Sequence, residues 1–270
     1  MPAADLPLLI DAAREAGRIA CRYTGTTAQK WEKAEGAGPV TEADLAVNEM
    51  LEARLPGARP GYGWLSEESE DDPDRQTRET LFIVDPIDGT RSFAEGSRTW
   101  AHSLAVAHRG VVTAAVIYLP QRDLLYAAAQ GEGATLNGEP IRVSEVPDLA
   151  RAEILAARPN LEARHWRAGA APEFARAYRP SLAYRLALVA EGRFDGMLTL
   201  RPSWEWDIAA GALIIEEAGG ACTDRGGAPL RFNTARARLD GVVAGGVAVH
   251  DALGAALRPG GPGLPDRRPS

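Results

Sequence analysis

The first sixty residues contain two stretches in which hydrophobic positions recur at helical spacing. Apolar side chains repeat in this way over residues 6–22, which predicts a first helix. Thr41 opens a second predicted helix that runs to about Leu55, because a threonine followed three residues later by an acid forms a capping-box-like signal. The polar, glycine-containing stretch 30–38 predicts a loop between the two helices, and the acidic stretch 66–78 predicts another.

Short apolar runs follow and indicate a sheet. The run 81–84 is bounded by Asp-Pro and predicts a buried strand, and three further strands are expected at hairpin spacing, at 103–109, 111–119 and 124–129. Beyond residue 150 the pattern alternates. We expect strands at 154–157, 194–200 and 241–249 and helices at 172–177, 181–191 and 206–218. Alternation of this kind is typical of a layered α/β arrangement.

This change of pattern divides the chain near residues 145–150. We expect an N-terminal α+β half over 1–148, which carries most of the candidate metal ligands, and a C-terminal α/β half over 149–257, which completes the site. The Pro/Gly-rich residues 258–270 are predicted to be a disordered tail. No linker is long enough to make the two halves independent.

Charge and composition exclude several classes of protein. The formal net charge of -7, from 37 acidic and 30 basic residues, argues against binding to a nucleic acid polymer, which favours a basic surface. It is compatible with a small phosphorylated ligand, since a metal ion can supply positive charge locally. No apolar run approaches the ~18 residues of a membrane helix, and the amino terminus has no apolar signal core, so we expect a cytoplasmic protein without a membrane partner. The two cysteines are too few for a disulfide scaffold, and the four histidines show no metal-ligand spacing.

The most informative segment is Asp-Pro-Ile-Asp-Gly-Thr at residues 85–90. A strand delivers Asp85 to its end, a turn at Pro86 brings Asp88 back beside it, and Gly89 permits a positive φ. Two carboxylates and a carbonyl at a strand end suit a hard divalent cation such as Mg²⁺. Asp-Pro and Asp-Gly are also ordinary turn signals, but the whole block directly after an apolar strand favours the metal site.

Further acids could complete such a site. Glu67 and Glu68 follow an apolar pair and could face inward, although an acidic loop is usually solvated. Asp207 lies at the start of a predicted helix between small residues and tryptophans, where the alternative role is an N-cap. Asp44, three residues after Thr41, has the same alternative role in capping its helix.

Four motifs in this order resemble the inositol monophosphatase superfamily of Mg²⁺-dependent, lithium-sensitive phosphatases. They are Gly-Pro-Val-Thr-Glu-Ala-Asp at 38–44, Ser-Glu-Glu-Ser at 66–69, Asp-Pro-Ile-Asp-Gly-Thr at 85–90 and Trp-Asp-Ile-Ala-Ala-Gly at 206–211. The resemblance covers roughly residues 5–255 and implies an α/β (α+β) fold, a layered α-β-α-β-α sandwich. It also implies a phosphoric monoester hydrolase with a small phosphorylated substrate. Dimers are common in that family, so a homodimer is one oligomeric state that the resemblance implies.

The same resemblance implies roles for individual residues. Thr90 and Asp44 would orient the attacking water, with Thr41 close by and Glu67 also contributing to catalysis. The backbone N–H groups of Gly89 and Thr90 would hold phosphate oxygens. The implied metal ligands are Glu67, Asp85, the carbonyl oxygen of Ile87, Asp88 and Asp207. Five ionised carboxylates in one place repel one another strongly, and two or three Mg²⁺ ions would make such a cluster stable and activate the water.

Local features favour one branch of that superfamily, the CysQ-type 3'(2'),5'-bisphosphate nucleotidases of sulfur assimilation. The Gly-Pro-Val-Thr, Glu-Trp-Asp and 181–192 segments are similar to theirs, except that Arg185 stands where they have lysine. Arg185 would pair with a second phosphate and Lys33 would lie near the phosphate, although either could be a solvated surface cation. The expected reaction converts 3'-phosphoadenosine 5'-phosphate to AMP and phosphate.

Two other hypotheses stand beside this one: a broader inositol, sugar-phosphate (such as fructose 1,6-bisphosphate) or histidinol-phosphate monoesterase, and a catalytically inactive phosphate sensor. Inositol-1-monophosphatase activity fits the same motifs, and Arg91-Ser92-Phe93 is similar to the histidinol phosphatases of the superfamily. A catalytically inactive phosphate sensor would lack a metal-site residue or Thr90, and every one of those positions is filled.

Overall fold

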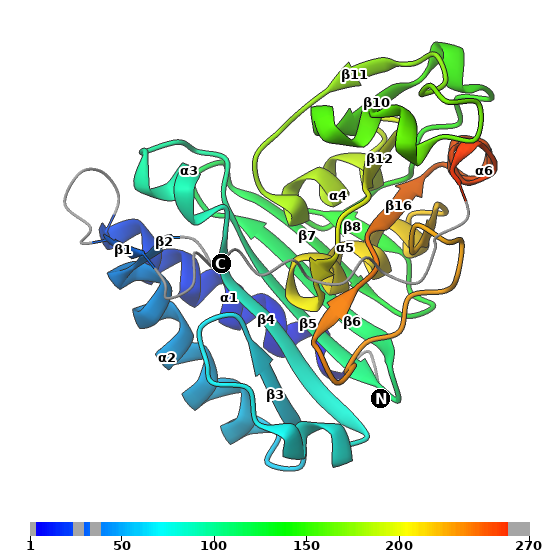
Figure 1. The fold of residues 1–270 in the computed structure, drawn as a ribbon. Helices are drawn as coiled ribbons and strands as arrows, with labels where there is room; N and C mark the ends of the chain where they lie inside the picture. The colour runs from blue at the N-terminus through cyan, green and yellow to red at the C-terminus, as the bar shows by residue number, and fades with distance from the viewer. Residues whose placement is uncertain (1–3, 24–29, 33–38, 259–270) are drawn as a thin grey trace, which may run out of the picture.

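The protein is described by a computed structural model that covers residues 4–23, 30–32 and 39–258. Helices and sheets alternate in layers (Figure 1), with a large sheet built from the N-terminal half and a smaller sheet built from the C-terminal half. The predicted α-β-α-β-α sandwich is confirmed. The division near residues 145–150 stays a prediction.

The large sheet has the strand order β3-β4-β5-β6-β7-β8-β9, and only its first pair, β3 and β4, is parallel. Its members are β3 (Gly63–Ser66), β4 (Thr80–Asp88), β5 (Ala101–His108), β6 (Val111–Leu119), β7 (Leu124–Ala129), β8 (Ala134–Leu136) and β9 (Glu139–Pro140). The predicted strands at 103–109, 111–119 and 124–129 are therefore confirmed to within two residues. Two short strands, β1 (Lys30–Glu32) and β2 (Pro39–Thr41), pair separately.

Helices α1 (Leu6–Ala20) and α2 (Glu42–Ala58) cover one face of the large sheet. The predicted capping box is present, because the Thr41 side chain accepts from the Asp44 N–H while the Asp44 carboxylate accepts from the Thr41 N–H. The opposite face packs against α4 (Leu182–Ala190) and α5 (Glu205–Glu217). These two helices also contact the smaller sheet, so they form the central layer.

The smaller sheet has the order β11-β10-β12-β16-β14. Its members are β10 (Glu153–Ala156), β11 (Ala175–Ala177), β12 (Gly196–Thr199), β14 (Ala221–Thr223) and β16 (Val242–Gly245). Helix α6 (Val247–Ala256) covers its outer face. The remaining elements are helix α3 (Thr90–Ala94), the paired strands β13 (Ser203–Trp204) and β15 (Arg238–Leu239), and 3₁₀ turns at Cys21–Tyr23, Pro73–Thr77, Leu149–Arg151, Arg158–Leu161 and Ala163–His165.

The predicted strand at 81–84 is confirmed as part of β4, and the packing of β4 explains why all four residues are apolar. Leu81 and Ile83 pack against the central helices, whereas Phe82 and Val84 pack against α1 and α2. Successive side chains of a strand point to opposite faces, so a strand between two helical layers must be apolar throughout. The alternation therefore fixes both interfaces of the large sheet.

Two predicted elements are wrong. Residues 172–177 do not form a helix, because residues 175–177 are the edge strand β11, which pairs in parallel with β10. Residues 241–249 are not one strand, because β16 ends at Gly245 and α6 begins at Val247. Val249, Leu253 and Leu257 lie one helical turn apart and bury the same face, an interface that outweighs the strand preference of valine.

Two further expectations need adjustment. The second helix continues through Pro56 to Ala58. The predicted loop at 30–38 includes strand β1, and its residues 33–38, with Lys33 and Gly38, lie outside the described residues, as does nearly all of the 258–270 tail. Among the described residues, no helix combines the length and apolar character that crossing a membrane would require.

Candidate active site

Strand β4 delivers two of the candidate ligands. It runs through Asp88 instead of ending at Val84, and the pairing with β5 shifts register between Asp85 and Asp88. The neighbouring strand β3 pairs only as far as Val84, so Pro86, which has no N–H to donate, lies where β4 has lost that partner. The register shift allows both aspartates to turn toward the same side, as expected from the sequence.

Gly89 ends this segment with the predicted positive φ, of 99°. A side chain at this φ would be strained, so glycine is required for the chain to turn from β4 into α3. Thr90, the first residue of α3, is thereby held with its hydroxyl 3.1 Å from an Asp44 oxygen and 3.1 Å from the Ile87 carbonyl oxygen. The Ile87 carbonyl thus lies in the same turn as the predicted ligands, although a role in metal binding stays a prediction.

Glu67 reaches the site because β3 and β4 are parallel. Their carboxyl ends meet at one edge of the sheet, and the Glu67 N–H donates to the Val84 carbonyl oxygen next to Asp85. Its side chain is partly exposed, and its charge raises the pKa values of Asp44, Asp85 and Asp207. Glu67 therefore lies close enough to act on the cluster electrostatically, while direct ligation stays a prediction.

Asp207 comes from the C-terminal half, in the first turn of α5. Ser103 lies opposite Asp85 in the β4–β5 register, and its buried hydroxyl donates to the Trp206 carbonyl oxygen over 2.9 Å. This contact fixes the beginning of α5 against the strand pair that carries Asp85. The side chain of Asp207 is consequently held beside the aspartates of β4.

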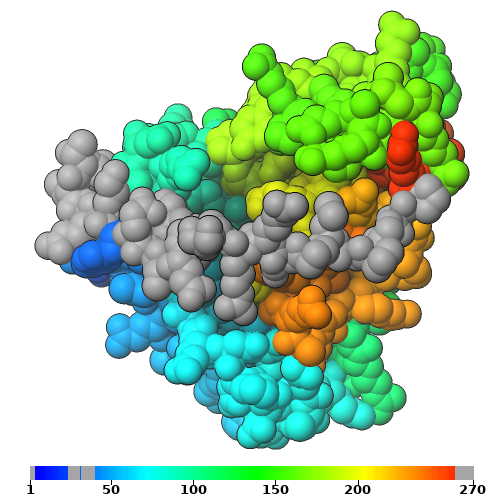
Figure 2. Space-filling model, in the orientation of Figure 1, coloured from blue at the N-terminus to red at the C-terminus, as the bar shows by residue number. Residues whose placement is uncertain are grey.

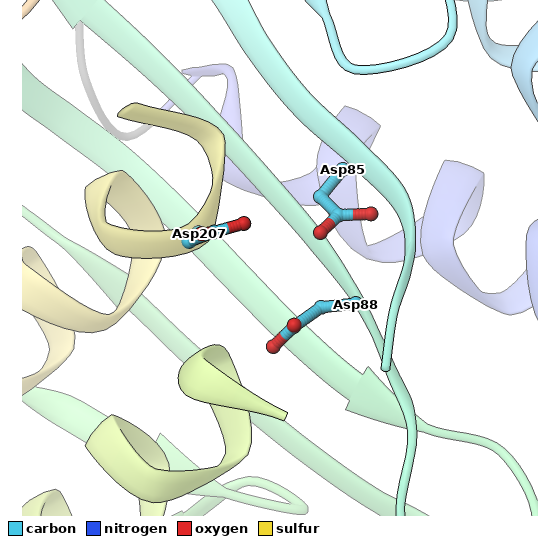
Figure 3. Close-up of side chains that lie close together, drawn as sticks. All are labelled: Asp85, Asp88 and Asp207. Atoms are coloured by element: carbon cyan, nitrogen blue, oxygen red, sulfur yellow. The ribbon is translucent and has the colours of Figure 1, made fainter. Parts of the chain in front are cut away.

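Asp85, Asp88 and Asp207 form the acidic triad of the site (Figure 3), in which one oxygen of each carboxylate lies within 4.8 Å of the others. Asp85 is 1% exposed, and its Oδ1 is a buried atom with no hydrogen-bond partner among the described residues. A buried carboxylate oxygen without a hydrogen-bond donor is unfavourable, so this atom fits a site that binds a cation. Residues far apart in the sequence are thus brought together as predicted.

The electrostatics of the triad point the same way. Burial raises the pKa of Asp85, and the charges of Glu67, Asp88 and Asp207 raise it further. Burial likewise raises the pKa of Asp207 and of Asp88, although hydrogen bonds from Ser181 and Ala183 oppose the shift at Asp88. Without a cation, these three carboxyl groups therefore keep their protons to a higher pH than they would in water.

The donor set fits Mg²⁺. Mg²⁺ is a hard cation that takes oxygen ligands, and the triad offers carboxylate oxygens from three side chains with at least one oxygen unsatisfied. The charge of the ion would offset the repulsion that raises the three pKa values. Among the residues that the structure describes, no histidine or cysteine belongs to this cluster, which disfavours a softer metal such as zinc.

Asp44 meets the turn after β4 through the Thr90 hydroxyl. It is 1% exposed and accepts hydrogen bonds from the Thr41 N–H and hydroxyl at Oδ2 and from Thr90 at Oδ1. Burial raises the pKa of Asp44 to about 6, against the lowering effect of the hydrogen bonds from Thr41. The capping role considered from the sequence is real, and the same carboxylate also contacts Thr90.

Arg185 lies inside the protein beside the triad. It is 8% exposed, and its Nε–H donates to the Ser181 carbonyl oxygen at 3.4 Å. Its charge lowers the pKa values of Asp88 and Asp207, while burial lowers its own pKa. No carboxylate of the described residues forms an ion pair with the guanidinium, which lies 5.5 Å from the ring centre of Tyr178. The interpretation of Arg185 as a solvated helix residue is therefore wrong.

Sequence reasoning did not find the residues that hold the site in place. Glu205 is fully buried and accepts hydrogen bonds from the Asn233 N–H and from the N–H and hydroxyl of Thr234. His102 is buried with Nδ1 against the Pro86 carbonyl oxygen, and burial lowers its pKa to about 4, so it is neutral. Glu205 could be noticed in the Glu-Trp-Asp motif, but nothing in the sequence indicated its partners.

Comparison with known proteins assigns the chain to a family. The family model described as "Inositol monophosphatase family" matches residues 4–258. The chain belongs to the inositol monophosphatase family. Members of this family are Mg²⁺-dependent phosphoric monoester hydrolases, which agrees with the predicted enzyme class and cofactor and with the acidic triad.

Individual relatives within the family carry different names. The inositol-1-monophosphatase of Mesorhizobium japonicum is 37% identical over 237 residues, covering 82% of this chain and 86% of the relative. The histidinol-phosphatase of Chlorobaculum parvum is 31% identical, covering 82% and 85%. The crystal structure of the extragenic suppressor protein suhB from Bartonella henselae has a TM-score of 0.78 at 33% identity, covering 93% of this chain and 97% of that one. None of these three names denotes a bisphosphate nucleotidase, so the narrower family branch stays a prediction.

Proposed function

We propose that this phosphatase hydrolyses a monoester that carries a second anionic group, with 3'-phosphoadenosine 5'-phosphate, cleaved to AMP and phosphate, as the leading substrate. One observation supports the second anion. The Arg185 guanidinium is buried beside the acidic triad, and no described carboxylate pairs with it. An unpaired buried cation is unfavourable, and a substrate phosphate would satisfy it with charge-assisted hydrogen bonds.

The roles proposed for the other residues follow from their geometry. Asp85, Asp88 and Asp207 would hold Mg²⁺ with Glu67 and the Ile87 carbonyl oxygen, and the N–H groups of Gly89 and Thr90 would bind phosphate oxygens. Bound Mg²⁺ supplies Lewis-acid stabilisation of the charge that develops on the phosphoryl oxygens. Lys33 near the phosphate stays part of this proposal as a prediction from the sequence.

Thr90 and Asp44 are proposed to position the attacking water. When the Thr90 hydroxyl donates to Asp44 Oδ1, 3.1 Å away, the hydroxyl oxygen is free to accept a hydrogen bond from that water. Asp44, with its pKa raised to about 6, is largely ionised near neutral pH and can accept a proton through this contact. Thr41 fixes the other oxygen of Asp44, so the carboxylate cannot rotate away from Thr90.

A second candidate is hydrolysis of inositol 1-phosphate. It is favoured by the 37% identity with the inositol-1-monophosphatase of Mesorhizobium japonicum. Inositol 1-phosphate has one phosphate, so in this case Arg185 would have no second phosphate to pair with. Histidinol phosphate, for which the Chlorobaculum parvum relative is named, belongs in the same comparison.

A substrate panel with two variants tests the proposal. We expect kcat/KM with Mg²⁺ to be highest for 3'-phosphoadenosine 5'-phosphate, compared with inositol 1-phosphate, fructose 1,6-bisphosphate and histidinol phosphate. Arg185→Gln should reduce kcat/KM for the bisphosphate nucleotide by about 10–100-fold, the equivalent of one charged hydrogen bond, and hardly change it for inositol 1-phosphate. The control is Arg109→Gln, which removes an exposed arginine paired with Glu79 beyond the other end of β5.

The outcomes separate the candidates. A higher kcat/KM for inositol 1-phosphate or histidinol phosphate would exclude the nucleotide proposal. An equal loss for all substrates in Arg185→Gln would show that Arg185 supports the site in general and does not recognise a second anion.

A further inference from the structure

Ser181 has an unusual backbone conformation next to the acidic triad. Its φ is 66° and its ψ is 117°, a region that residues with a side chain rarely adopt. It is the N-cap of α4, a position at which serine ordinarily has β-region dihedral angles. Strain of this kind persists only where surrounding contacts require it.

The contacts of Ser181 identify what requires this conformation. Its hydroxyl donates to Asp88 Oδ2 over 2.6 Å, and the Ala183 N–H donates to the same oxygen over 2.6 Å. The hydroxyl oxygen also accepts from the Tyr184 N–H over 3.0 Å, which caps α4. The Ser181 side chain therefore caps α4 and holds the Asp88 carboxylate at the same time.

These contacts fix one of the two Asp88 oxygens. Oδ2 accepts from the Ser181 hydroxyl and from the Ala183 N–H in the first turn of α4, and a hydrogen bond from the Leu182 N–H also lowers the pKa of Asp88. One Asp88 oxygen lies within 4.8 Å of a carboxylate oxygen of Asp85 and one of Asp207, so fixing Oδ2 against α4 limits where Oδ1 can lie. Partners of this type, one shell beyond the metal, orient the ligand and raise metal affinity.

We propose that Ser181 is a positioning residue for Asp88, whose hydroxyl holds the carboxylate so that Oδ1 faces the cation position shared with Asp85 and Asp207. The strained backbone is retained because the hydroxyl reaches Asp88 from it. The inference rests on the proposed assignment of Asp88 as a metal ligand. The competing explanation is that Ser181 only caps α4, in which case its loss affects folding stability alone.

Two substitutions separate the hydroxyl from the strain. Ser181→Gly removes the hydroxyl and relieves the positive φ, whereas Ser181→Thr keeps the hydroxyl and makes the backbone conformation less favourable. The measurement is the Mg²⁺ concentration at half-maximal stabilisation of the metal-free protein, taken from thermal melts, together with the Tm without metal. For Ser181→Gly we expect this midpoint to rise by about 10–100-fold while the metal-free Tm does not fall. For Ser181→Thr we expect a lower Tm with a nearly unchanged midpoint.

Ser144→Gly is a matched control. The Ser144 hydroxyl donates to Asp195 Oδ1 over 2.6 Å, the same contact between the same residue types, and Asp195 is not part of the acidic triad. This variant should keep the wild-type Mg²⁺ midpoint. If Ser181→Gly binds Mg²⁺ as the wild type does, or shifts the midpoint no more than Ser144→Gly, the proposal is wrong.

Asp88→Asn distinguishes failure of this inference from failure of the proposed site. If Asp88→Asn loses the Mg²⁺ response and Ser181→Gly keeps it, Asp88 is a ligand but Ser181 does not position it. If Asp88→Asn itself responds to Mg²⁺ like the wild type, the ligand assignment is wrong, and the inference about Ser181 is overturned with it.

Discussion

At the scale of single residues, the partners of each carboxylate oxygen decide what that carboxylate can do. Both oxygens of Asp44 have donors, from Thr41 and Thr90, which suits a group that positions other atoms. Asp88 Oδ2 accepts two hydrogen bonds from the first turn of α4. Asp85 Oδ1 is buried with no partner among the described residues, so Asp85 depends most on a cation.

Asp85→Asn should therefore separate stability from function. We expect turnover and Mg²⁺ affinity to fall by at least ~100-fold, because the variant loses a charged ligand. The Tm of the metal-free protein should rise, since burial and neighbouring acids destabilise the ionised form of Asp85. Near-normal kcat, or an unchanged Mg²⁺-induced rise in Tm, would contradict the assignment. Asp74→Asn, at an exposed acid of the 66–78 loop, controls for the loss of one negative charge.

The sequence was sufficient for the parts of the site that lie in continuous motifs. Asp85, Asp88, Gly89 and Thr90 follow one another, so the strand and the glycine turn largely determine how they meet. The contact between Ser181 and Asp88 spans 93 positions and leaves no local trace. A serine before a helix predicts a cap, and only the packing of α4 against β4 shows a second partner.

At the scale of elements, helix α5 links the two halves of the site. Its first turn carries Asp207 and is held by the Ser103 hydroxyl from the large sheet and by Glu205, which is anchored to residues 233–234. The region 232–234 is in turn tied to the acidic loop, because the buried Arg75 donates to Asn233 and to the Thr234 carbonyl oxygen. The position of Asp207 therefore depends on contacts with both halves.

Glu205→Gln tests this dependence. The two carboxylate oxygens of Glu205 share the three hydrogen bonds, and the amide nitrogen of glutamine cannot accept any of them. We therefore expect the free energy of unfolding to fall by about 2 kcal/mol in chemical denaturation. The Mg²⁺ midpoint should rise as well, because the turn that holds Asp207 loosens.

Glu217→Gln is the matched control on the same helix. Glu217 accepts from the N–H groups of Gly131 and Gly133 near the opposite end of α5. This variant should lose stability without a change in Mg²⁺ midpoint. Equal effects on the midpoint in both variants would show that general loosening of α5, and not the anchoring of its first turn, controls the metal site.

Elements were predictable where one face or two faces of a segment are apolar in a regular pattern, as in α1 and β4. The two wrongly predicted elements are ones whose structure is determined by contacts with distant segments. Residues 175–177 form a strand because they pair with the edge strand β10, and residues 247–256 form a helix that buries its apolar face against the smaller sheet. The local periodicity of the sequence indicates neither contact.

At the scale of the whole molecule, the acidic site lies where the two halves meet. In Figure 2 the segment near residue 200, in yellow, lies between the region near residues 60–90, in cyan, and the region near residues 150–180, in yellow-green. One core cluster includes Leu81 and Ile83 of the large sheet together with Leu155 and Met197 of the smaller sheet. Because Asp85 and Asp88 come from β4 and Asp207 comes from α5, a cation bound by all three would couple metal binding to the folding of both sides of this core.

The buried acids of the site predict that the folding stability of the metal-free protein depends on pH. Burial raises the pKa of Asp44 from 3.8 to about 6, and the pKa values of Asp85, Asp88 and Asp207 are also raised. A carboxyl whose pKa is higher in the folded state binds more protons when folded, so the free energy of unfolding decreases as pH rises through that interval. The metal-free protein should become less stable from about pH 4 to about pH 6 and beyond, as the more strongly shifted acids ionise.

Mg²⁺ should reverse this loss, because it binds the ionised cluster of the folded protein. We expect the Mg²⁺-induced rise in Tm to be larger at about pH 7.5 than at about pH 5, as measured by thermal melts with and without Mg²⁺. A rise that is the same at both pH values, or no rise at saturating Mg²⁺, would mean that these carboxylates do not form the metal site.

Anomalous diffraction from crystals soaked with Mn²⁺ in place of Mg²⁺ tests whether the carboxylates of β4 and α5 bind a divalent cation together. We predict an anomalous peak within coordination distance of Asp85, Asp88 and Asp207, absent from crystals of Asp85→Asn. A well-ordered triad without a peak, or a peak only at other residues, would contradict the account.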